Sequence, residues 1–362
     1  MLVIVLGTRP EIIKTAPVVL EAMRRGIPVS LVHTGQHYDD ALDGLFFREL
    51  GLPVPSHNLG VGSMPPAKQI GAMLSGLQDV LTALKPQVVM VQGDTNSVLA
   101  GALAAHKMGI PVAHLEAGLR SDDWDMPEEA NRVLAGCVTD VHFCPTEIQR
   151  GRLKGETIVD GVYVVGNTVV DAAVLYRSSV APADVKSRLG VAGPHALLTM
   201  HRPSNVDEPA RLAAMIEMLG KLAESRGWRI VFPVHPRTRA RLEAAGMWNA
   251  LKRDTRFVIT EPIGYLDLLA LQASAELVLT DSGGMQEEAN ILRVPCVTLR
   301  PNTERPETVE AGGNILYAGT DAYELGVMID ELVKRPRDWT CPFGDGRTAS
   351  RVVDILQAQN LL

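Results

Sequence analysis

Short apolar runs rich in β-branched residues alternate with longer amphipathic stretches along the whole chain. This alternation is typical of parallel β-sheets whose strands are joined by helical crossovers. The runs are almost continuously apolar, as expected for strands that helices cover on both faces. Two series of strands are predicted: Leu2–Leu6, Val29–His33, Val88–Gln92, Val112–Glu116, Val141–Cys144 and Val162–Val165, then Ala196–Met200, Arg229–Val234, Phe257–Thr260, Leu277–Thr280, Cys296–Leu299 and Ile315–Tyr317.

The length of 362 residues indicates two domains, because a single hydrophobic core stops growing at roughly 250–300 residues. We expect a first α/β domain over residues 1–180 and a second over 181–345. A C-terminal helix over 346–362 could cross back to pack on the first domain. The turn-forming pieces Ala-Pro-Ala-Asp and Val-Ala-Gly-Pro, between Ser178 and Gly193, suit the interdomain connection.

Composition and charge exclude several classes of protein. Hydrophobic residues make up 46% of the chain and charged residues 21%, which is typical of globular rather than disordered or fibrous proteins. The net charge of −7 and the absence of a dense Lys/Arg run argue against a nucleic-acid partner. The N-terminus lacks the features of a signal peptide, and no apolar run approaches the ~20 residues that span a bilayer. We therefore expect a cytoplasmic protein that is not embedded in a membrane.

Neither a metal nor a cofactor is expected. The cysteines at 137, 144, 296 and 341 show no CxxC spacing and are predicted to be buried thiols. The pairs His33 with His37 and His201 with His235 lack metal-ligand spacing. Neither GxGxxG nor GxxxxGK[ST] occurs at a strand-to-helix turn, which argues against an NAD enzyme and a P-loop ATPase.

Polar segments follow directly on the predicted strands in both halves. Ligands of open parallel sheets bind beyond the carboxyl ends of the strands, so these positions are the ones that meet a ligand. Any one segment could simply be a turn or a helix cap. The whole set favours a cleft that carries both carboxylates and cations: Gly7–Glu11, Gly93–Asn96, Glu116–Arg120, His201–Pro203, His235–Arg237 and Asp281–Gly284.

The segment Asp281–Glu288, a strand end followed by a small-residue turn and a helix start, predicts a phosphate or pyrophosphate seat. Glycines let the backbone approach closely, and the N–H groups and dipole of a helix N-terminus favour an anion. An ordinary strand-to-helix turn has a similar composition, so the motif alone is weak. Arg9 and Lys14 at the start of the first helix, with Arg305 in the second half, are either clamps for that anion or solvated charges.

Three carboxylates in the first half are candidate acid/base groups. Asp94 and Glu116 end adjacent strands, and Glu128 opens a predicted helix. Capping explains Glu128 electrostatically, and a turn cap is an alternative for Asp94. Glu116 differs, because burial at the end of an apolar strand is unfavourable for a carboxylate. His201 is a further polar group expected to point into the cleft.

Taken together and in order, these segments resemble the UDP-N-acetylglucosamine 2-epimerases, and the likeness covers nearly the whole chain. The matching blocks are Gly7–Glu11 with Lys14, Gly93–Thr95, His114–Arg120, Pro127–Arg132, Gly166–Thr168, Asp281–Glu288 and Glu304–Glu307. The resemblance implies a glycosyltransferase-B-like fold of two Rossmann-like domains, and a homodimer. It also implies reversible conversion of UDP-N-acetylglucosamine to UDP-N-acetylmannosamine, which supplies sugars for cell-surface polysaccharides.

The resemblance also implies roles for individual residues. The catalytic group corresponds to Asp94, Glu116, Glu128 and His201, and Pro262–Tyr265 would border the uracil. The contacts to the nucleotide sugar correspond to Asp94, Glu116 and His201 again, with Arg9, Lys14, Ser282, Gly283, Gly284, Glu288 and Arg305.

The family route expels UDP from carbon 1 while carbon 2 loses its proton, which leaves a 2-acetamidoglucal to which UDP adds back. Cations and a helix N-terminus would then stabilise the leaving pyrophosphate, and carboxylates would move the proton. Alternatives are a hydrolysing 2-epimerase, an epimerase of a UDP-diacetamido sugar, a glycosyltransferase and a non-catalytic UDP-sugar sensor. The run Gln36–Asp39 and the residue Ala72 depart from the pattern of members that a second UDP-N-acetylglucosamine regulates, and Pro203 departs from the commoner His-Arg-Arg-Glu-Asn run.

Overall fold

The computed structural model describes residues 1–36 and 40–362, so most of the predicted departure at Gln36–Asp39 lies outside the described residues. The chain divides into two compact units. Unit 1 comprises Met1–Val174 together with Phe343–Leu362, and unit 2 comprises Leu175–Pro342. Each unit is described by itself.

Unit 1 is built on a seven-stranded sheet in which every pair of neighbouring strands is parallel. The strand order is β3-β2-β1-β4-β5-β6-β7. Strands β1 to β3 are added toward one edge of the sheet and β4 to β7 toward the other, so the switch point lies between β1 and β4. Ligands of doubly wound folds bind at such a switch point. The strands are β1 (Leu2–Leu6), β2 (Val29–His33), β3 (His57–Asn58), β4 (Val88–Gln92), β5 (Val112–Leu115), β6 (Val141–Cys144) and β7 (Val162–Val164).

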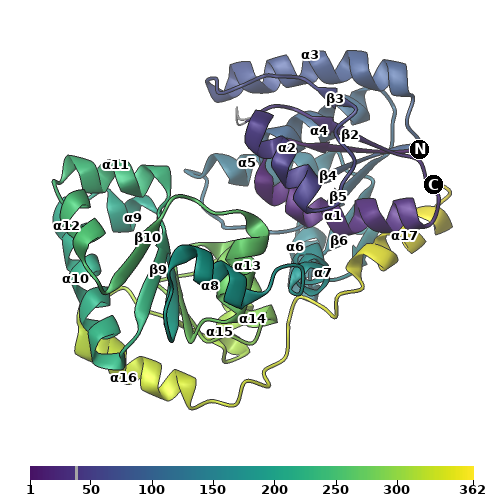
Figure 1. Ribbon diagram of the computed structural model, residues 1–362. Helices are drawn as coiled ribbons and strands as arrows, with labels where there is room; N and C mark the ends of the chain where they lie inside the picture. Colours follow the sequence, from purple (N-terminus) through teal and green to yellow (C-terminus); the bar gives the residue numbers. More distant parts are fainter. Residues whose placement is uncertain (37–39) are drawn as a thin grey trace. The chain divides into compact units, whose positions relative to one another are not determined.

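Helices cover both faces of the unit 1 sheet. Side chains alternate along β1, and its Val3 and Val5 pack against α3 and α4 on one face. On the other face α1 crosses β1, β2 and β4, and the C-terminal α17 packs beside α1 (Figure 1). An ion pair between Arg25 and Asp354 joins these two helices. The helices are α1 (Arg9–Arg24), α2 (Asp40–Glu49), α3 (Pro66–Leu84), α4 (Asn96–Lys107), α5 (Pro127–Cys137), α6 (Glu147–Gly155), α7 (Thr168–Tyr176) and α17 (Thr348–Ala358).

Unit 2 repeats the same topology with a six-stranded parallel sheet. Its order is β10-β9-β8-β11-β12-β13, which places the switch point between β8 and β11. The order 3-2-1-4-5-6 is that of a Rossmann sheet, so both units confirm the predicted fold class of two doubly wound α/β domains. The strands are β8 (His195–Thr199), β9 (Arg229–Pro233), β10 (Phe257–Thr260), β11 (Leu277–Thr280), β12 (Cys296–Thr298) and β13 (Asn314–Leu316).

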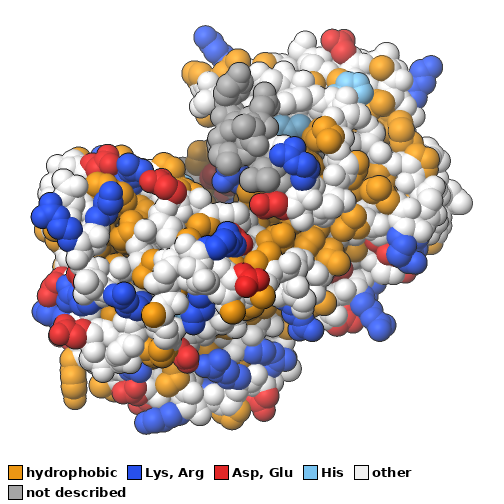
Figure 2. Space-filling view, viewed as in Figure 1, with side chains coloured by type: hydrophobic (Ala, Val, Ile, Leu, Met, Phe, Trp, Pro, Cys, Tyr) orange, Lys and Arg blue, Asp and Glu red, His pale blue; other side chains and the backbone are white. Residues whose placement is uncertain are grey.

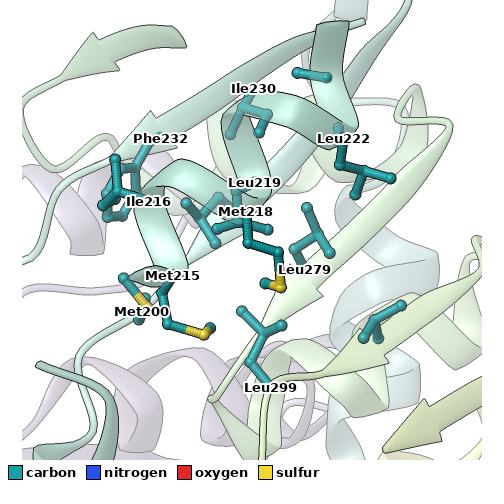
Figure 3. Packing of buried hydrophobic residues seen from close by; sticks show 14 of the residues in the cluster. Met200, Met215, Ile216, Met218, Leu219, Leu222, Ile230, Phe232, Leu279 and Leu299 are labelled. Carbon is teal, nitrogen blue, oxygen red and sulfur yellow. The ribbon is translucent and has the colours of Figure 1, made fainter. Parts of the chain in front are cut away.

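The larger core of unit 2 lies between its sheet and α10. Met215, Met218 and Leu219 of α10 pack onto Phe232 of β9 and Leu279 of β11 (Figure 3). Residues of α8, α13 and α14 cover the opposite face. The helices are α8 (Pro182–Leu189), α9 (Pro203–Val206), α10 (Pro209–Arg226), α11 (Pro236–Ala244), α12 (Trp248–Arg253), α13 (Tyr265–Ala273), α14 (Gly283–Ile291), α15 (Pro306–Glu310) and α16 (Ala322–Val333).

Each predicted strand is present, with bounds that differ by a residue or two at some ends. The sequence did not predict β3, because His57–Asn58 is short and polar and gives no apolar run. The Ala-Pro-Ala-Asp piece, expected to be a turn, instead begins α8, with Pro182 in the first helical turn, where a missing N–H costs nothing.

The prediction that all four cysteines are buried is wrong. Cys144 and Cys296 are buried in β6 and β12, whereas Cys137 is exposed and Cys341 is only partly buried. Cys137 ends the amphipathic helix α5, and a polar face of such a helix lies in solvent.

The surface of the molecule mixes charges of both signs. On the face shown in Figure 2, Lys and Arg side chains are interspersed with Asp and Glu over both units. Among the described residues, no helix is both long and apolar enough to cross a membrane.

Candidate active site

Asp94 and Glu116 lie at the carboxyl ends of the neighbouring strands β4 and β5. The register pairs Gln92 with Leu115, so both carboxylates follow the last paired residues of their strands, next to the switch point of the sheet. Glu116 adopts φ 66°, a left-handed conformation that is uncommon for a residue with a side chain. Such conformations persist where the surroundings enforce them, and they are enriched at functional sites.

The Glu116 carboxylate is buried and accepts hydrogen bonds on both of its oxygens. Lys14 Nζ lies 2.8 Å from each of its two oxygens, and the Glu116 side chain is only 5% exposed. The Gln92 side chain donates to Oε2, and Asn167 Nδ2 donates to Oε1 at 3.3 Å. A buried charge is tolerated only with such partners. Three elements of unit 1, namely α1, β4 and the chain after β7, therefore converge on this carboxylate.

Asp94 retains some solvent access and has an altered pKa. Its carboxylate pairs with Arg132, whose Nη2 lies 2.8 Å from Oδ2, and the side chain is 31% exposed. Burial raises the pKa of Asp94 above its usual value, and the negative charge of Glu116 raises it further, while Arg132 and Lys14 oppose the shift. A carboxyl with a raised pKa beside a second, ionically paired carboxylate is suited to acid/base chemistry.

The Pro127–Arg132 segment places two neighbouring glutamates in different surroundings. Glu128 is exposed in the first turn of α5. Glu129 is buried and accepts hydrogen bonds from Ser121 and the Asp122 N–H, and its Oε2 lies 2.6 Å from Arg132 Nη1. Within unit 1, therefore, the predicted Glu128 does not share the buried surroundings of Glu116. Glu129 holds Arg132 in position, and their i, i+3 spacing was the available sequence signal.

Glu11 was not predicted as a site residue, yet it fixes the turn after β1. Its Oε2 accepts the N–H groups of Gly7 at 2.6 Å and Thr8 at 2.7 Å, and its Oε1 accepts the Thr95 hydroxyl at 2.5 Å. Thr95 follows Asp94, so the carboxyl of Glu11 ties the end of β1 to the end of β4. Burial raises the pKa of Glu11 to about 7 despite these hydrogen bonds.

Arg9 and Lys14, the residues of unit 1 predicted to bind phosphate, both contact other side chains of unit 1. Lys14 in α1 contacts Glu116, as described above. The Arg9 guanidinium lies over the Phe46 ring, 5.1 Å from its centroid, in the geometry of a cation–π contact.

In unit 2, a buried aspartate organises the turn that carries His201. Asp281 is fully buried at the end of β11 and accepts the N–H groups of His201 and Arg202, each at 2.9 Å from Oδ2. It also accepts Asn205 Nδ2 and lies 3.1 Å from His201 Nδ1. Burial works against ionisation, but the hydrogen bonds led by His201 lower the pKa of Asp281. The side chain of His201 remains 34% exposed and lies against His235, with ring centroids 5.1 Å apart and ring planes tilted by 33°.

The N-terminus of α14 fits the predicted anion seat. Ser282 is the N-cap, but its side chain makes no cap hydrogen bond. Gly283 and Gly284 open the helix, and a Cβ at either position would meet nothing within 4 Å. Neither packing nor a left-handed backbone requires glycine here, although glycine costs a helix up to about 1 kcal/mol relative to alanine. Open space over free N–H groups at a helix N-terminus suits a phosphate.

The other predicted nucleotide contacts of unit 2 lie on α14 and on the helices α13 and α15, which precede and follow it in the sequence. Arg305 is the N-cap of α15 and donates from Nε to Glu287, which is buried in α14. Glu288 is buried next to it. Tyr265, at the start of α13, is buried as well, and burial together with the nearby Glu288 raises its pKa well above the usual value. The described residues contain no group of three or more His, Cys, Asp or Glu that could hold a metal.

Comparison with known proteins assigns the chain to a family. The family model described as UDP-N-acetylglucosamine 2-epimerase matches residues 21–357. The chain belongs to this epimerase family. A curated UDP-N-acetylglucosamine 2-epimerase from Methanocaldococcus jannaschii is 46% identical over 359 residues, which cover 98% of this chain and 98% of the relative.

A solved structure supports the assignment, and another relative is named for a different sugar substrate. The crystal structure of the Methanocaldococcus jannaschii epimerase in complex with UDP-GlcNAc and UDP superposes with a TM-score of 0.88 and covers 99% of both chains at 46% identity. The fold is therefore glycosyltransferase-B-like, as expected. A Pseudomonas aeruginosa relative is 37% identical over 97% of this chain and 98% of its own length, and it is named UDP-2,3-diacetamido-2,3-dideoxy-D-glucuronate 2-epimerase.

The stability of this epimerase family member should depend on pH through Glu11. Its pKa rises from 4.5 to about 7 on folding, so the folded state binds the proton more tightly than the unfolded state. The contribution to stability is complete below pH 4.5 and is lost as the pH rises through about 7; the shift corresponds to about 3 kcal/mol. Urea denaturation across this range should show that Glu11→Gln, which keeps the shape and loses the titration, removes this part of the decline.

The exposed Glu331 supplies the matched control. Glu331→Gln should leave the pH dependence of the unfolding free energy as in the unmodified protein. Equal pH dependence in the Glu11→Gln variant and the unmodified protein would contradict the raised pKa.

Proposed function

We propose that this protein is a non-hydrolysing epimerase that interconverts UDP-N-acetylglucosamine and UDP-N-acetylmannosamine. The family match over residues 21–357 carries the proposal, and the carboxylates Asp94 and Glu116 at adjacent strand ends support it. The choice of substrate is supported by 46% identity to a UDP-N-acetylglucosamine 2-epimerase, against 37% to the diacetamido-glucuronate enzyme. A homodimer and a cytoplasmic location remain parts of this proposal.

The proposed reaction begins with elimination. The hydrogen on carbon 2 has no adjacent carbonyl and is weakly acidic, so its removal is coupled to departure of UDP from carbon 1. The C2–H and C1–O bonds break, a C1=C2 double bond forms, and the products are a 2-acetamidoglucal and UDP. Protonation of carbon 2 from the other face and return of UDP to carbon 1 then complete the inversion.

Unit 1 is proposed to supply the acid/base groups. Asp94 has both solvent access and a pKa raised above its usual value, and both properties favour a role in proton transfer. Glu116 is held by three side-chain donors and would act from a fixed position. Glu128, exposed on α5, is proposed to join this group through its place in the matching motif.

Unit 2 is proposed to bind UDP. The N–H groups at the start of α14, with Ser282, Gly283 and Gly284, would accept the pyrophosphate. His201, Glu288 and Arg305 are proposed as further contacts, together with Arg9 and Lys14 of unit 1. Because the leaving group carries the developing negative charge, fixed donors that stabilise it lower the barrier to elimination.

Incubation with UDP-N-acetylglucosamine in heavy water tests the reaction. NMR should show deuterium at carbon 2 and the appearance of UDP-N-acetylmannosamine, without net release of UDP. Accumulation of free N-acetylmannosamine and UDP would instead identify a hydrolysing enzyme. Substrate recovered without deuterium would refute the epimerase proposal. A parallel sample with a UDP-diacetamido uronic sugar tests the alternative substrate.

Conservative changes of the two carboxylates should separate chemistry from binding. Asp94→Asn or Glu116→Gln should slow exchange at carbon 2 by at least about 100-fold, because acid/base catalysis typically contributes that much. UDP affinity, measured by calorimetry, should remain largely unchanged, since most of the proposed UDP contacts come from unit 2. Asp79→Asn, at an exposed position of α3, is the control and should exchange normally. Near-normal exchange in both active-site variants would refute their assignment.

Alanine at the anion seat should have opposite effects on stability and binding. Because a Cβ at Gly284 meets open space, Gly284→Ala should raise the unfolding free energy, by less than the ~1 kcal/mol of a helix interior since Gly284 lies in the first turn of α14. It should weaken UDP binding by about 10-fold or more, because the methyl group displaces an anion from charge-assisted N–H contacts.

Gly326→Ala is the matched control for the anion seat. Gly326 lies in α16 of the same unit and also faces open space. This variant should gain stability without losing UDP affinity. Unchanged UDP affinity in Gly284→Ala would place the pyrophosphate elsewhere.

A further inference from the structure

The chain passes between the two units twice, and both passages meet at one place in unit 1. The outgoing chain leaves through α7, which begins at Thr168, and the returning chain enters unit 1 at Phe343 and continues into α17 (Figure 1). The Asn167 N–H donates to the Phe343 carbonyl at 2.7 Å. Asp171 Oδ1 accepts the Ala349 N–H at 2.8 Å in the first turn of α17.

The two chain segments touch backbone to backbone at a pair of glycines. Gly166 has φ 97° and Gly344 has φ 115°, conformations that favour glycine. A Cβ on Gly166 would lie 2.7 Å from Thr348 Oγ1 and 3.0 Å from the Phe343 carbonyl oxygen. The returning chain therefore lies directly against the residue that precedes Asn167.

The side chain of Asn167 connects this crossing to Glu116. It is 3% exposed, and its Nδ2 donates to Glu116 Oε1 at 3.3 Å. Its Oδ1 accepts the Val169 N–H at 3.1 Å. This second bond fixes the orientation of the amide, because the reversed amide would set NH₂ against an N–H donor and its oxygen against a carboxylate.

We propose that Asn167 is a positioning residue that orients the Glu116 carboxylate for proton transfer, and that the returning segment at Phe343 holds Asn167 in place. This inference rests on the proposed function. Lys14 spans both oxygens of Glu116, and Gln92 donates to Oε2. Asn167 donates to Oε1, so it helps to set the rotation of the carboxylate plane.

Serine and alanine at position 167 separate the two bonds of the Asn167 side chain. Serine can still accept the Val169 N–H as a short cap but does not reach Glu116, whereas alanine loses both bonds. Asn167→Ser should lower kcat about 10-fold or more, because Glu116 loses a donor that fixes its orientation and small misplacements of a reacting group slow the reaction. KM and UDP affinity should stay close to those of the unmodified protein. Asn167→Ala should show the same loss of kcat with an additional loss of stability.

Asn167→Asp keeps the shape and the bond to Val169 but faces Glu116 with a second carboxylate. Like charges raise the pKa of one of the pair, so the limb of the kcat–pH profile that reports deprotonation should move to higher pH by about one unit or more. This shift distinguishes positioning of Glu116 from a merely structural role, which would alter the melting temperature and leave the profile in place.

The control is the unmodified protein in the heavy-water experiment. If it shows no exchange at carbon 2, the proposed function fails. If it exchanges, two results would overturn the positioning role. The first is a normal kcat in Asn167→Ser together with a normal pH profile in Asn167→Asp, and the second is a loss of thermal stability alone in both variants. A reduced kcat with a displaced pH profile and retained UDP affinity supports it.

Discussion

The contact between Lys14 and the buried Glu116 carboxylate is the interaction around which unit 1 is organised. Leaving such a carboxylate without a partner typically costs about 3–5 kcal/mol, so the fold must bring its donors to the end of β5. Lys14 comes from the first helix, Gln92 from β4 and Asn167 from the chain after β7. The strand order β1-β4-β5 places the first two beside the carboxylate.

Both units use a buried acid to join the turns at their switch points. In unit 1, Glu11 binds the N–H groups after β1 and the Thr95 hydroxyl after β4. In unit 2, Asp281 follows β11 and binds the N–H groups of His201 and Arg202 after β8. The strands β8 and β11 occupy the positions in their sheet that β1 and β4 occupy in the other. Burial raises the pKa of both acids, but at Asp281 the contacts with His201, Arg202 and Asn205 outweigh it, whereas at Glu11 the hydrogen bonds do not.

Much of the fold was predictable, because buried parallel strands leave continuous apolar runs that the sequence displays directly. The positions of Asp94 and Glu116 at neighbouring strand ends were predictable for a related reason, since residues that follow such runs lie at one edge of the sheet. The burial and the partners of Glu11, Glu129 and Asp281 were not predicted, because a carboxylate in a first helical turn or after a strand has the same local sequence whether it is solvated or buried. Cys137 was placed wrongly because hydrophobic character does not determine which face of α5 a residue occupies.

The sequence by itself determined two doubly wound α/β units, the strand ends that carry polar groups and, through the order of its motifs, the family. These properties depend on local periodicity and on residue identity along the chain. The tertiary structure decided which polar groups meet: Lys14 with Glu116, Arg132 with Asp94, and Asn167 with both Glu116 and the returning chain at Phe343. Those partners are separated by up to 176 positions in the numbering of the chain, and only the packing of the sheet and its helices brings them within hydrogen-bonding distance.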